Sequence, residues 1–147
     1  MGLDLTSFAY SVLLVGVLVQ AANWLAPWHD LTEAGCRVTY VYDGDTVALT
    51  CDGVEETARL VGFDTAEVKD PGCAAEARHG AQATDRLRAL VAGGAVTLTS
   101  EGYDRYGRRL VVLRVDGRDV ADTMVAEGLA TRYRGGARIN WCERLGA

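Results

Sequence analysis

Residues 36–51 read CRVTYVYDGDTVALTC and predict a β-hairpin. The two flanks, Arg37–Tyr42 and Thr46–Cys51, alternate in polarity and are rich in Val, Thr and Tyr, residues that favour strands. Asp43-Gly44 stands between them, and an Asp-Gly pair between alternating apolar residues is a strong hairpin signal. With this pair in the turn, the predicted register opposes Tyr40 to Val47, Val38 to Leu49 and Cys36 to Cys51.

The hairpin also predicts how the four cysteines pair. Directly opposed residues of an antiparallel ladder have about the Cα spacing that a disulfide requires, so Cys36 is expected to bond to Cys51. Cys73 and Cys142 are then left to form the second disulfide. A zinc site is disfavoured, because no cysteine pair has C-x-x-C spacing and the two histidines are not placed to help.

The chain beyond the hairpin predicts an α+β fold that is mainly β. A third strand is expected at Glu55–Phe63, and the next elements are a helix, two strands and a second helix. Their expected ranges are Ala74–Ala92 (ended by a Gly93-Gly94 cap), Ala95–Ser100, Arg108–Val115 and Val120–Glu127. This order describes a five-stranded Greek-key barrel of the OB type, with two or three helices, over residues 36–147.

The N-terminal segment, residues 1–28, predicts export. Phe8–Ala22 contains no charged residue and ends in small residues, as in a signal peptide. The longer run Leu5–Trp28 would alternatively suffice as an uncleaved membrane-anchoring helix. Asp4 stands where either type of segment usually carries a basic residue, which argues against both. The third alternative, a buried N-terminal helix, is disfavoured because the segment shows no polar face. Residues 29–35 are expected to be a linker, and the protein to be a periplasmic, extracellular or membrane-anchored monomer.

The net charge of −5 argues against tight, non-specific binding to a polyanion. The charges are unevenly distributed, however: residues 1–100 hold 6 Lys or Arg against 13 Asp or Glu, and residues 101–147 hold 9 against 7. Arginine outnumbers lysine 14 to 1, and arginine is the better bidentate ligand for phosphate. A local site for an anionic substrate therefore remains open.

Several charged residues fall at the ends of the predicted strands. Asp45 enters the second strand, Arg59 lies in the third, and Asp64 and Glu67 follow it. Metal-assisted phosphodiester hydrolysis needs carboxylates for a hard cation, a group that orients or deprotonates water, and cations on the phosphoryl oxygens. Arg59 and Asp64 are five residues apart, so an ideal strand would point them to opposite faces, and a bend near Gly62 is expected to bring them together.

Three motifs resemble those of the thermonuclease, or staphylococcal nuclease-like, family. Residues 41–47 (VYDGDTV) resemble its V-x-D-G-D-T motif, residues 59–67 (RLVGFDTAE) its R-L-x-x-x-D-T-P-E motif, and residues 104–108 (DRYGR) its D-x-Y-G-R motif. The similarity runs in order from about Arg37 to Tyr133.

The resemblance implies a calcium-dependent nuclease that acts on DNA and RNA with little sequence preference and leaves 3′-phosphate ends. It assigns calcium binding to the carboxylates of Asp45 and Asp64 and to the backbone carbonyl of Thr65. Glu67 would position or deprotonate the attacking water, and Arg59 and Arg108 would hold the phosphate. Arg105 and Tyr106 would stand beside the substrate.

Two alternatives remain open at this point. Some OB folds bind nucleic acid without catalysis, so the chain could be a binding module of the cell envelope. The charged residues could also form only a structural network of salt bridges, and Asp43 is expected to be a plain turn residue. One departure from the family motif is Ala66, which stands in place of a proline and is expected to loosen the loop that presents Glu67. Whether this change lowers activity stays open.

Overall fold

The computed structural model describes residues 35–147. The segment expected at residues 1–28, with its hydrophobic helix, and almost all of the linker expected at 29–35 lie outside the described residues. The strands are β1 (Cys36–Val41), β2 (Thr46–Cys51), β3 (Val54–Leu60), β4 (Phe63–Thr65), β5 (Val96–Tyr103), β6 (Arg109–Val115), β7 (Arg118–Asp119) and β8 (Ala130–Arg132). The helices are α2 (Ala74–Gly93), α3 (Val120–Ala126) and α4 (Trp141–Arg144). Within residues 35–147, no helix combines the length and the apolar character needed to cross a bilayer.

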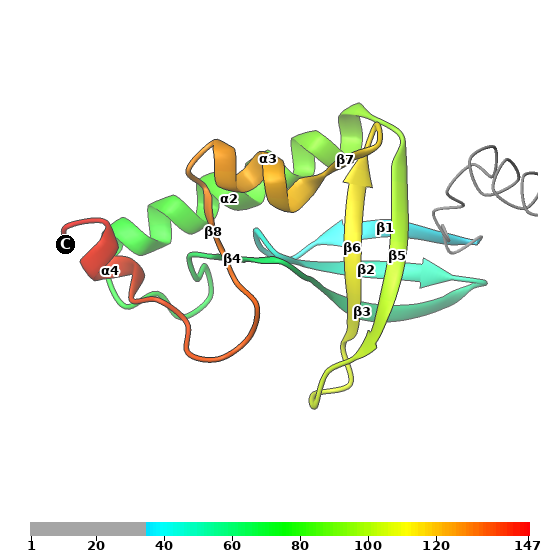
Figure 1. Ribbon diagram of the computed structural model, residues 1–147, viewed down its shortest axis with the longest axis horizontal. Helices are drawn as coiled ribbons and strands as arrows, with labels where there is room; N and C mark the ends of the chain where they lie inside the picture. The colour runs from blue at the N-terminus through cyan, green and yellow to red at the C-terminus, as the bar shows by residue number, and fades with distance from the viewer. Residues whose placement is uncertain (1–34) are drawn as a thin grey trace, which may run out of the picture. The chain divides into compact units, whose positions relative to one another are not determined.

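The main sheet has the order β1-β2-β3-β6-β5, with β7 paired to β6. Its β1–β2, β2–β3 and β5–β6 pairs are antiparallel, whereas β3 and β6 run parallel. Figure 1 shows β5 and β6 crossing the three-stranded meander, as expected of a strongly curled sheet. The predicted α+β fold of the OB type is thus confirmed.

The predicted third strand is wrong at its end. The chain leaves β3 after Leu60, turns at Gly62, whose φ of 91° is unfavourable for residues with a side chain, and begins β4 at Phe63. The short β4 pairs with β8 in a separate two-stranded sheet. The bend near Gly62, which the sequence predicts, therefore lets the chain pass from β3 in the main sheet to β4 in the second sheet.

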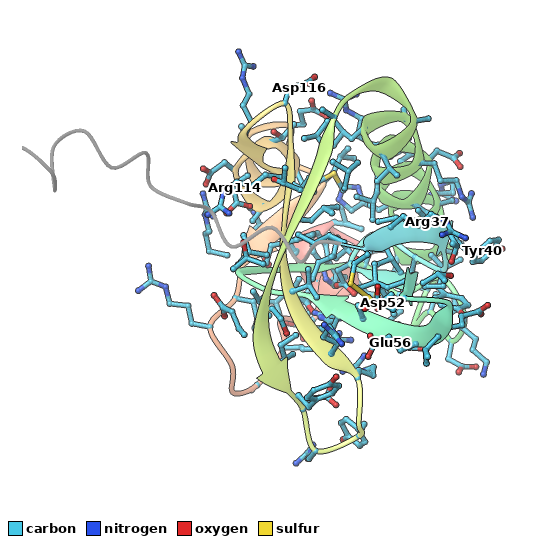
Figure 2. The ribbon with its side chains drawn as sticks, turned by 90° about the vertical axis from the view of Figure 1, so that its right-hand side faces the viewer. Arg37, Tyr40, Asp52, Glu56, Arg114 and Asp116 are labelled. Atoms are coloured by element: carbon cyan, nitrogen blue, oxygen red, sulfur yellow. A yellow bond between two sulfur atoms is a disulfide. The ribbon has the colours of Figure 1, made fainter. Side chains whose placement is uncertain are left out.

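The register of the first hairpin is confirmed at its open end and is wrong near its turn. Cys36 opposes Cys51 and Val38 opposes Leu49, but Tyr40 opposes Ala48 because an irregularity between Val38 and Tyr40 adds one residue to β1. Both predicted disulfides, Cys36–Cys51 and Cys73–Cys142, are present. In Figure 2 the outward-pointing Tyr40 on β1 shows the solvent face of this strand.

The core lies inside the curled sheet and under α2 and α3. Its most deeply buried members alternate along the strands or line the inner helix faces, and include Val47, Leu49, Leu60, Phe63, Leu87, Val111, Leu113 and Met124.

The predicted cap of the first helix is only partly right. Gly94 ends α2 in an extended conformation (φ −150°, ψ 176°), and a Cβ on it would lie 2.5 Å from Val115 Cγ1 and Asp116 Oδ2. Close packing against the turn labelled at Asp116 in Figure 2 therefore explains this glycine.

The C-terminal segment is fastened to the start of α2. Figure 1 shows α4 beside the first turns of α2, where the Cys73–Cys142 disulfide joins the two. Trp141 is 3% exposed and lies with its ring centroid 5.1 Å from that of His79 on α2. Residues 133–140, between β8 and α4, are thereby held at both ends, which matters for the site below.

Candidate functional site

Asp45 and Asp64, 19 positions apart in the sequence, meet on a single guanidinium group. Arg59 in β3 donates from Nη1 to Asp45 Oδ1 and from Nη2 to Asp64 Oδ1, the latter at 3.1 Å. Only 2% of Asp45, 1% of Asp64 and 7% of Arg59 are exposed. Charged groups are buried in this way only when they are paired, so the three residues form one electrostatic unit.

The turn between β1 and β2 positions Asp45. The Asp45 backbone N–H donates to Asp43 Oδ1 at 3.0 Å, which confirms Asp43 as a turn residue. Asp45 Oδ2 accepts bonds from the backbone N–H and the hydroxyl of Thr65, at 3.0 and 3.1 Å. A Cβ on Gly44 would lie 2.8 Å from the side chains of Thr65 and Ala83, so only glycine lets the turn approach β4 and α2 this closely.

Asp64 is held from three directions. Besides Arg59, its carboxylate accepts a bond from the indole Nε1–H of Trp141 at 3.3 Å and pairs with Arg138 Nε at 2.9 Å. The ladder between β4 and β8 places Asp64 opposite Thr131 and sets the direction of its side chain. Asp64 is therefore shared between the bent chain after β3 and the segment that follows β8.

Glu67 lies on the loop between β4 and α2, and its side chain is 43% exposed. Buried Glu76, in the first turn of α2, accepts the backbone N–H groups of Glu67 at 3.4 Å and Gly72 at 2.7 Å. A Cβ on Gly80 would lie 2.7 Å from the Ala66 carbonyl oxygen and 2.9 Å from that of Glu67. Glu76 and the close packing on Gly80 thus fix this loop against α2. It is the same loop that Ala66 is expected to loosen.

Arg138 and Glu76 are two site residues that sequence reasoning missed. Arg138 pairs with Glu67 Oε1 through Nη1 as well as with Asp64. The sequence contains a signal for each of them. Glu76 stands three residues after the helix-capping Cys73, and a glutamate at this spacing can accept a hydrogen bond from the backbone at the start of the helix. The predicted Cys73–Cys142 bond required the segment containing Arg138 to pass close to the Glu67 loop.

The residues Asp45, Asp64, Glu67, Arg59 and Arg138 are called the carboxylate cluster below. With all groups ionised, three carboxylates face two guanidinium groups in it, one more negative than positive charge. Burial raises the pKa of Asp45 to about 7, because loss of hydration outweighs the attraction of Arg59, and Asp43 raises it further. A cation bound at these carboxylates would favour the ionised form of Asp45 and offset this cost.

The donor set suits a hard divalent cation. Carboxylate oxygens and a backbone carbonyl are the ligands that calcium prefers in proteins. In residues 35–147, the one group of three metal-ligating side chains whose ligand atoms all lie within 4.8 Å of one another is Cys73, Glu76 and Cys142, and its two sulfur atoms are bonded to each other. Asp45, Asp64 and Glu67 are more widely spaced than this, but their oxygen ligands are the ones that suit a hard cation.

A groove of about 1410 Å³ adjoins the cluster, with Arg59 and Arg138 in its wall. Figure 1 shows the β5–β6 loop and the segment after β8 extending to the same side of the fold, and residues of both line the groove. The charged residues of the wall are six arginines, Arg59, Arg105, Arg108, Arg132, Arg134 and Arg138, and three acids, Glu101, Asp104 and Asp119. This basic surface on an acidic protein is called the arginine groove below.

Arg108, Arg105 and Tyr106 lie on the β5–β6 loop in the wall of the groove. Arg108 is 32% exposed at its side chain and donates from Nε to Asp104 Oδ2 at 2.8 Å, so it contacts this loop rather than the carboxylate cluster. The guanidinium of Arg105 stacks 4.8 Å from the ring centroid of Tyr106, which is 69% exposed. The structure thus brings Asp45, Asp64, Thr65 and Arg59 into contact, joins Glu67 to Asp64 through Arg138, and places the other three predicted residues along the adjoining groove.

Comparisons with known proteins identify the family of the chain. A family model described as "Staphylococcal nuclease homologue" matches residues 57–141. The SPbeta prophage-derived endonuclease YokF of Bacillus subtilis is 38% identical over 91 residues, which are 60% of this chain and 30% of that protein. An uncharacterized endonuclease of Escherichia coli O157:H7 is 39% identical over 98 residues, 66% of this chain and 60% of that protein. A thermonuclease of Staphylococcus hyicus is 27% identical over 132 residues, 88% of this chain and 78% of that protein.

Proposed function

The chain belongs to the staphylococcal nuclease homologue family, and from this premise we propose that it is a calcium-dependent nuclease that hydrolyses phosphodiester bonds of DNA and RNA. The single observation that carries the proposal is the charge balance of the carboxylate cluster at the edge of the arginine groove. One divalent cation and one phosphodiester, with its single negative charge, would together neutralise the charge that the two arginines leave over. The names of the relatives, endonuclease and thermonuclease, support the same activity.

Asp45 and Asp64 would hold the calcium ion through their carboxylates, with the backbone carbonyl of Thr65 as a further ligand. When bound, the ion supplies a positive charge that polarises the phosphoryl oxygen and the attacking water. Arg59 keeps the two aspartates together, because its guanidinium bonds to both. A weak site of few carboxylates suits a compartment with abundant calcium, and two disulfides favour an oxidising compartment. We therefore propose an exported protein.

Glu67 is suited to act on water. Its side chain is partly exposed, so water and substrate can reach it, and its backbone is fixed by Glu76. A carboxylate that is positioned within reach of a water molecule can orient it or accept its proton. Departure of the 5′ oxygen would then leave a 3′-phosphate end.

The arginines of the groove would bind the phosphate. Guanidinium groups present donors in a fixed fork that matches phosphoryl oxygens, and they stabilise charge that develops during the reaction. Arg59 and Arg108 would act on the reacting phosphate, and Arg105 and Tyr106 would hold the neighbouring nucleotide by charge and by ring stacking. Contacts to phosphate and to the face of a base carry no sequence information, so little sequence preference is expected.

The alternative function, a non-catalytic OB-fold nucleic-acid-binding module of the envelope, would share the basic groove and its tyrosines. It has no need of three carboxylates, two of them buried, at the end of that groove. Burying such groups costs stability, and this cost is explained by a role in binding a cation. The retained cluster therefore favours the nuclease.

The proposal predicts that purified protein degrades plasmid DNA and RNA in calcium and that excess chelator abolishes both activities. Glu67→Ala is expected to lower kcat by about 10²–10⁴-fold, the usual contribution of a positioned acid or base. The matched control is Glu127→Ala, which removes a glutamate that is likewise held by an arginine, Arg86, outside the cluster and the groove. Undiminished cleavage under chelation, or equal rates for the two variants, would contradict the proposal.

A further inference from the structure

We propose that Arg138 is a positioning residue of this site, which competes with calcium for Asp64 and orients Glu67. The inference rests on the proposed function, because it concerns the same carboxylates. It assigns a role to the segment between β8 and α4, which the three sequence motifs do not reach. Arg138 would thereby be the third arginine of the active site, beside Arg59 and Arg108.

The contacts of Arg138 are divided between two acids. Nε lies 2.9 Å from Asp64 Oδ1, and Nη1 donates to Glu67 Oε1. Asp64 is 1% exposed and Glu67 is on an accessible loop, so the guanidinium of Arg138 lies between the buried part of the cluster and the groove. A lysine has a single charged nitrogen and could not reproduce both contacts in this geometry.

The position of Arg138 puts it in competition with a metal ion. Asp64 Oδ1 already accepts Arg59 Nη2 at 3.1 Å, and Asp64 Oδ2 accepts the indole of Trp141 at 3.3 Å. The pair with Arg138 takes up more of the remaining capacity of Asp64 for a cation. A calcium ion bound to this carboxylate would be repelled by the nearby Arg138 guanidinium, so we expect calcium to weaken the bond between Arg138 and Asp64, whereas the bond to Glu67 can persist.

The chain is built to keep Arg138 in place. Trp141, three residues further on, is buried against His79, and Cys142 is bonded to Cys73 at the start of α2. Asn140 caps α4 by accepting the backbone N–H groups of Cys142 and Glu143, at 3.1 and 3.3 Å. The arginine thus extends from a segment that is anchored three and four residues further on, and its side chain is 39% exposed.

These two roles give Arg138→Ala an unusual signature. Without the competing guanidinium, calcium should bind more tightly, by about three- to tenfold for the loss of one partly exposed charge pair. Without the bond to Glu67, kcat should fall by about tenfold or more, since small errors in placing a catalytic group are costly. A residue that only stabilised the fold would, on removal, weaken calcium binding and kcat together.

The experiment measures calcium binding by isothermal titration calorimetry without nucleic acid, and kcat and KM on a single-stranded oligonucleotide at saturating calcium. Wild type, Arg138→Ala, Arg138→Lys and Arg86→Ala are compared. Arg86 also pairs with a glutamate, but it lies outside the cluster and the groove, so its variant controls for the loss of one arginine. Thermal melting with and without calcium adds a second binding readout that is independent of catalysis.

Arg138→Ala is expected to bind calcium more tightly, to gain more melting temperature from calcium than wild type, and to lose kcat with little change in KM. Arg138→Lys keeps one charged nitrogen, so it should bring either the calcium affinity or kcat part of the way back to the wild-type value, but not both. Unchanged affinity and kcat, or a joint loss of both, would overturn the inference. If wild type neither binds calcium nor cleaves, the proposed function fails; if wild type binds calcium and cleaves while Arg138→Ala matches it in both, only the role of Arg138 fails.

Discussion

Arg59→Ala is expected to lower the free energy of unfolding of the metal-free protein by about 3–5 kcal/mol, the usual cost of removing one partner from a buried ion pair. Asp45 and Asp64 would remain almost fully buried, with no guanidinium between them. Such a loss is a large part of the stability of a small domain, which is typically about 5–15 kcal/mol. Activity should also be lost, because the two proposed calcium ligands would repel each other.

Urea unfolding of the metal-free protein measures this effect. Arg59→Lys keeps the charge but has one nitrogen for two carboxylates, so an intermediate loss is expected. The control is Arg86→Ala, which removes an exposed pair and should hardly change the free energy of unfolding. Added calcium should stabilise Arg59→Ala more than wild type, since the ion replaces the missing positive charge. A loss below that of the control would mean that Arg59 does not support the cluster.

Arg108→Ala is expected to lower kcat by about 10²–10³-fold, the effect of removing one donor that stabilises transition-state charge. The fold should hardly change. Asp104, the partner of Arg108, would still accept the backbone N–H groups of Tyr106 and Arg108, at 2.8 and 3.0 Å, and these bonds keep the β5–β6 loop in shape.

Steady-state kinetics on a defined oligonucleotide distinguish this role from simple binding. Arg105→Ala, on the same loop, should raise KM more than it lowers kcat, because Arg105 is proposed to contact the neighbouring nucleotide rather than the reacting phosphate. Arg108→Ala should show the reverse. Cleavage by Arg108→Ala at the wild-type rate would remove Arg108 from the catalytic mechanism.

The sequence predicted those parts of the fold that depend on local chemistry. The Asp-Gly turn located the first hairpin, and its register at Cys36 and Cys51 predicted both disulfides. The bend at Gly62 was predicted because Arg59 and Asp64 could not share one face of a straight strand. Each inference needed only the two-residue period of a strand or the conformational freedom of glycine.

Features that depend on tertiary packing were not predicted. The irregularity between Val38 and Tyr40 leaves no mark in the alternating pattern, so Tyr40 was assigned the wrong partner. The net charge of −5 does not indicate a groove lined by six arginines, because these side chains come from distant segments and only the folded chain brings them together. Arg138 lies more than 70 residues beyond Glu67, and only the second disulfide indicated that the two would meet.

Calcium titration of Asp64→Asn by isothermal titration calorimetry, beside wild type, tests most directly whether these strand ends form one cation site. Asparagine has nearly the same shape and its amide oxygen can still accept the indole N–H of Trp141, but it lacks the negative charge through which a carboxylate attracts calcium strongly. Wild type is expected to bind one calcium ion per chain, and Asp64→Asn to bind it far more weakly and to lose nuclease activity, while circular dichroism shows a retained fold. Equal calcium binding by the two proteins, or none by wild type, would contradict the account and leave the cluster as a network of structural salt bridges.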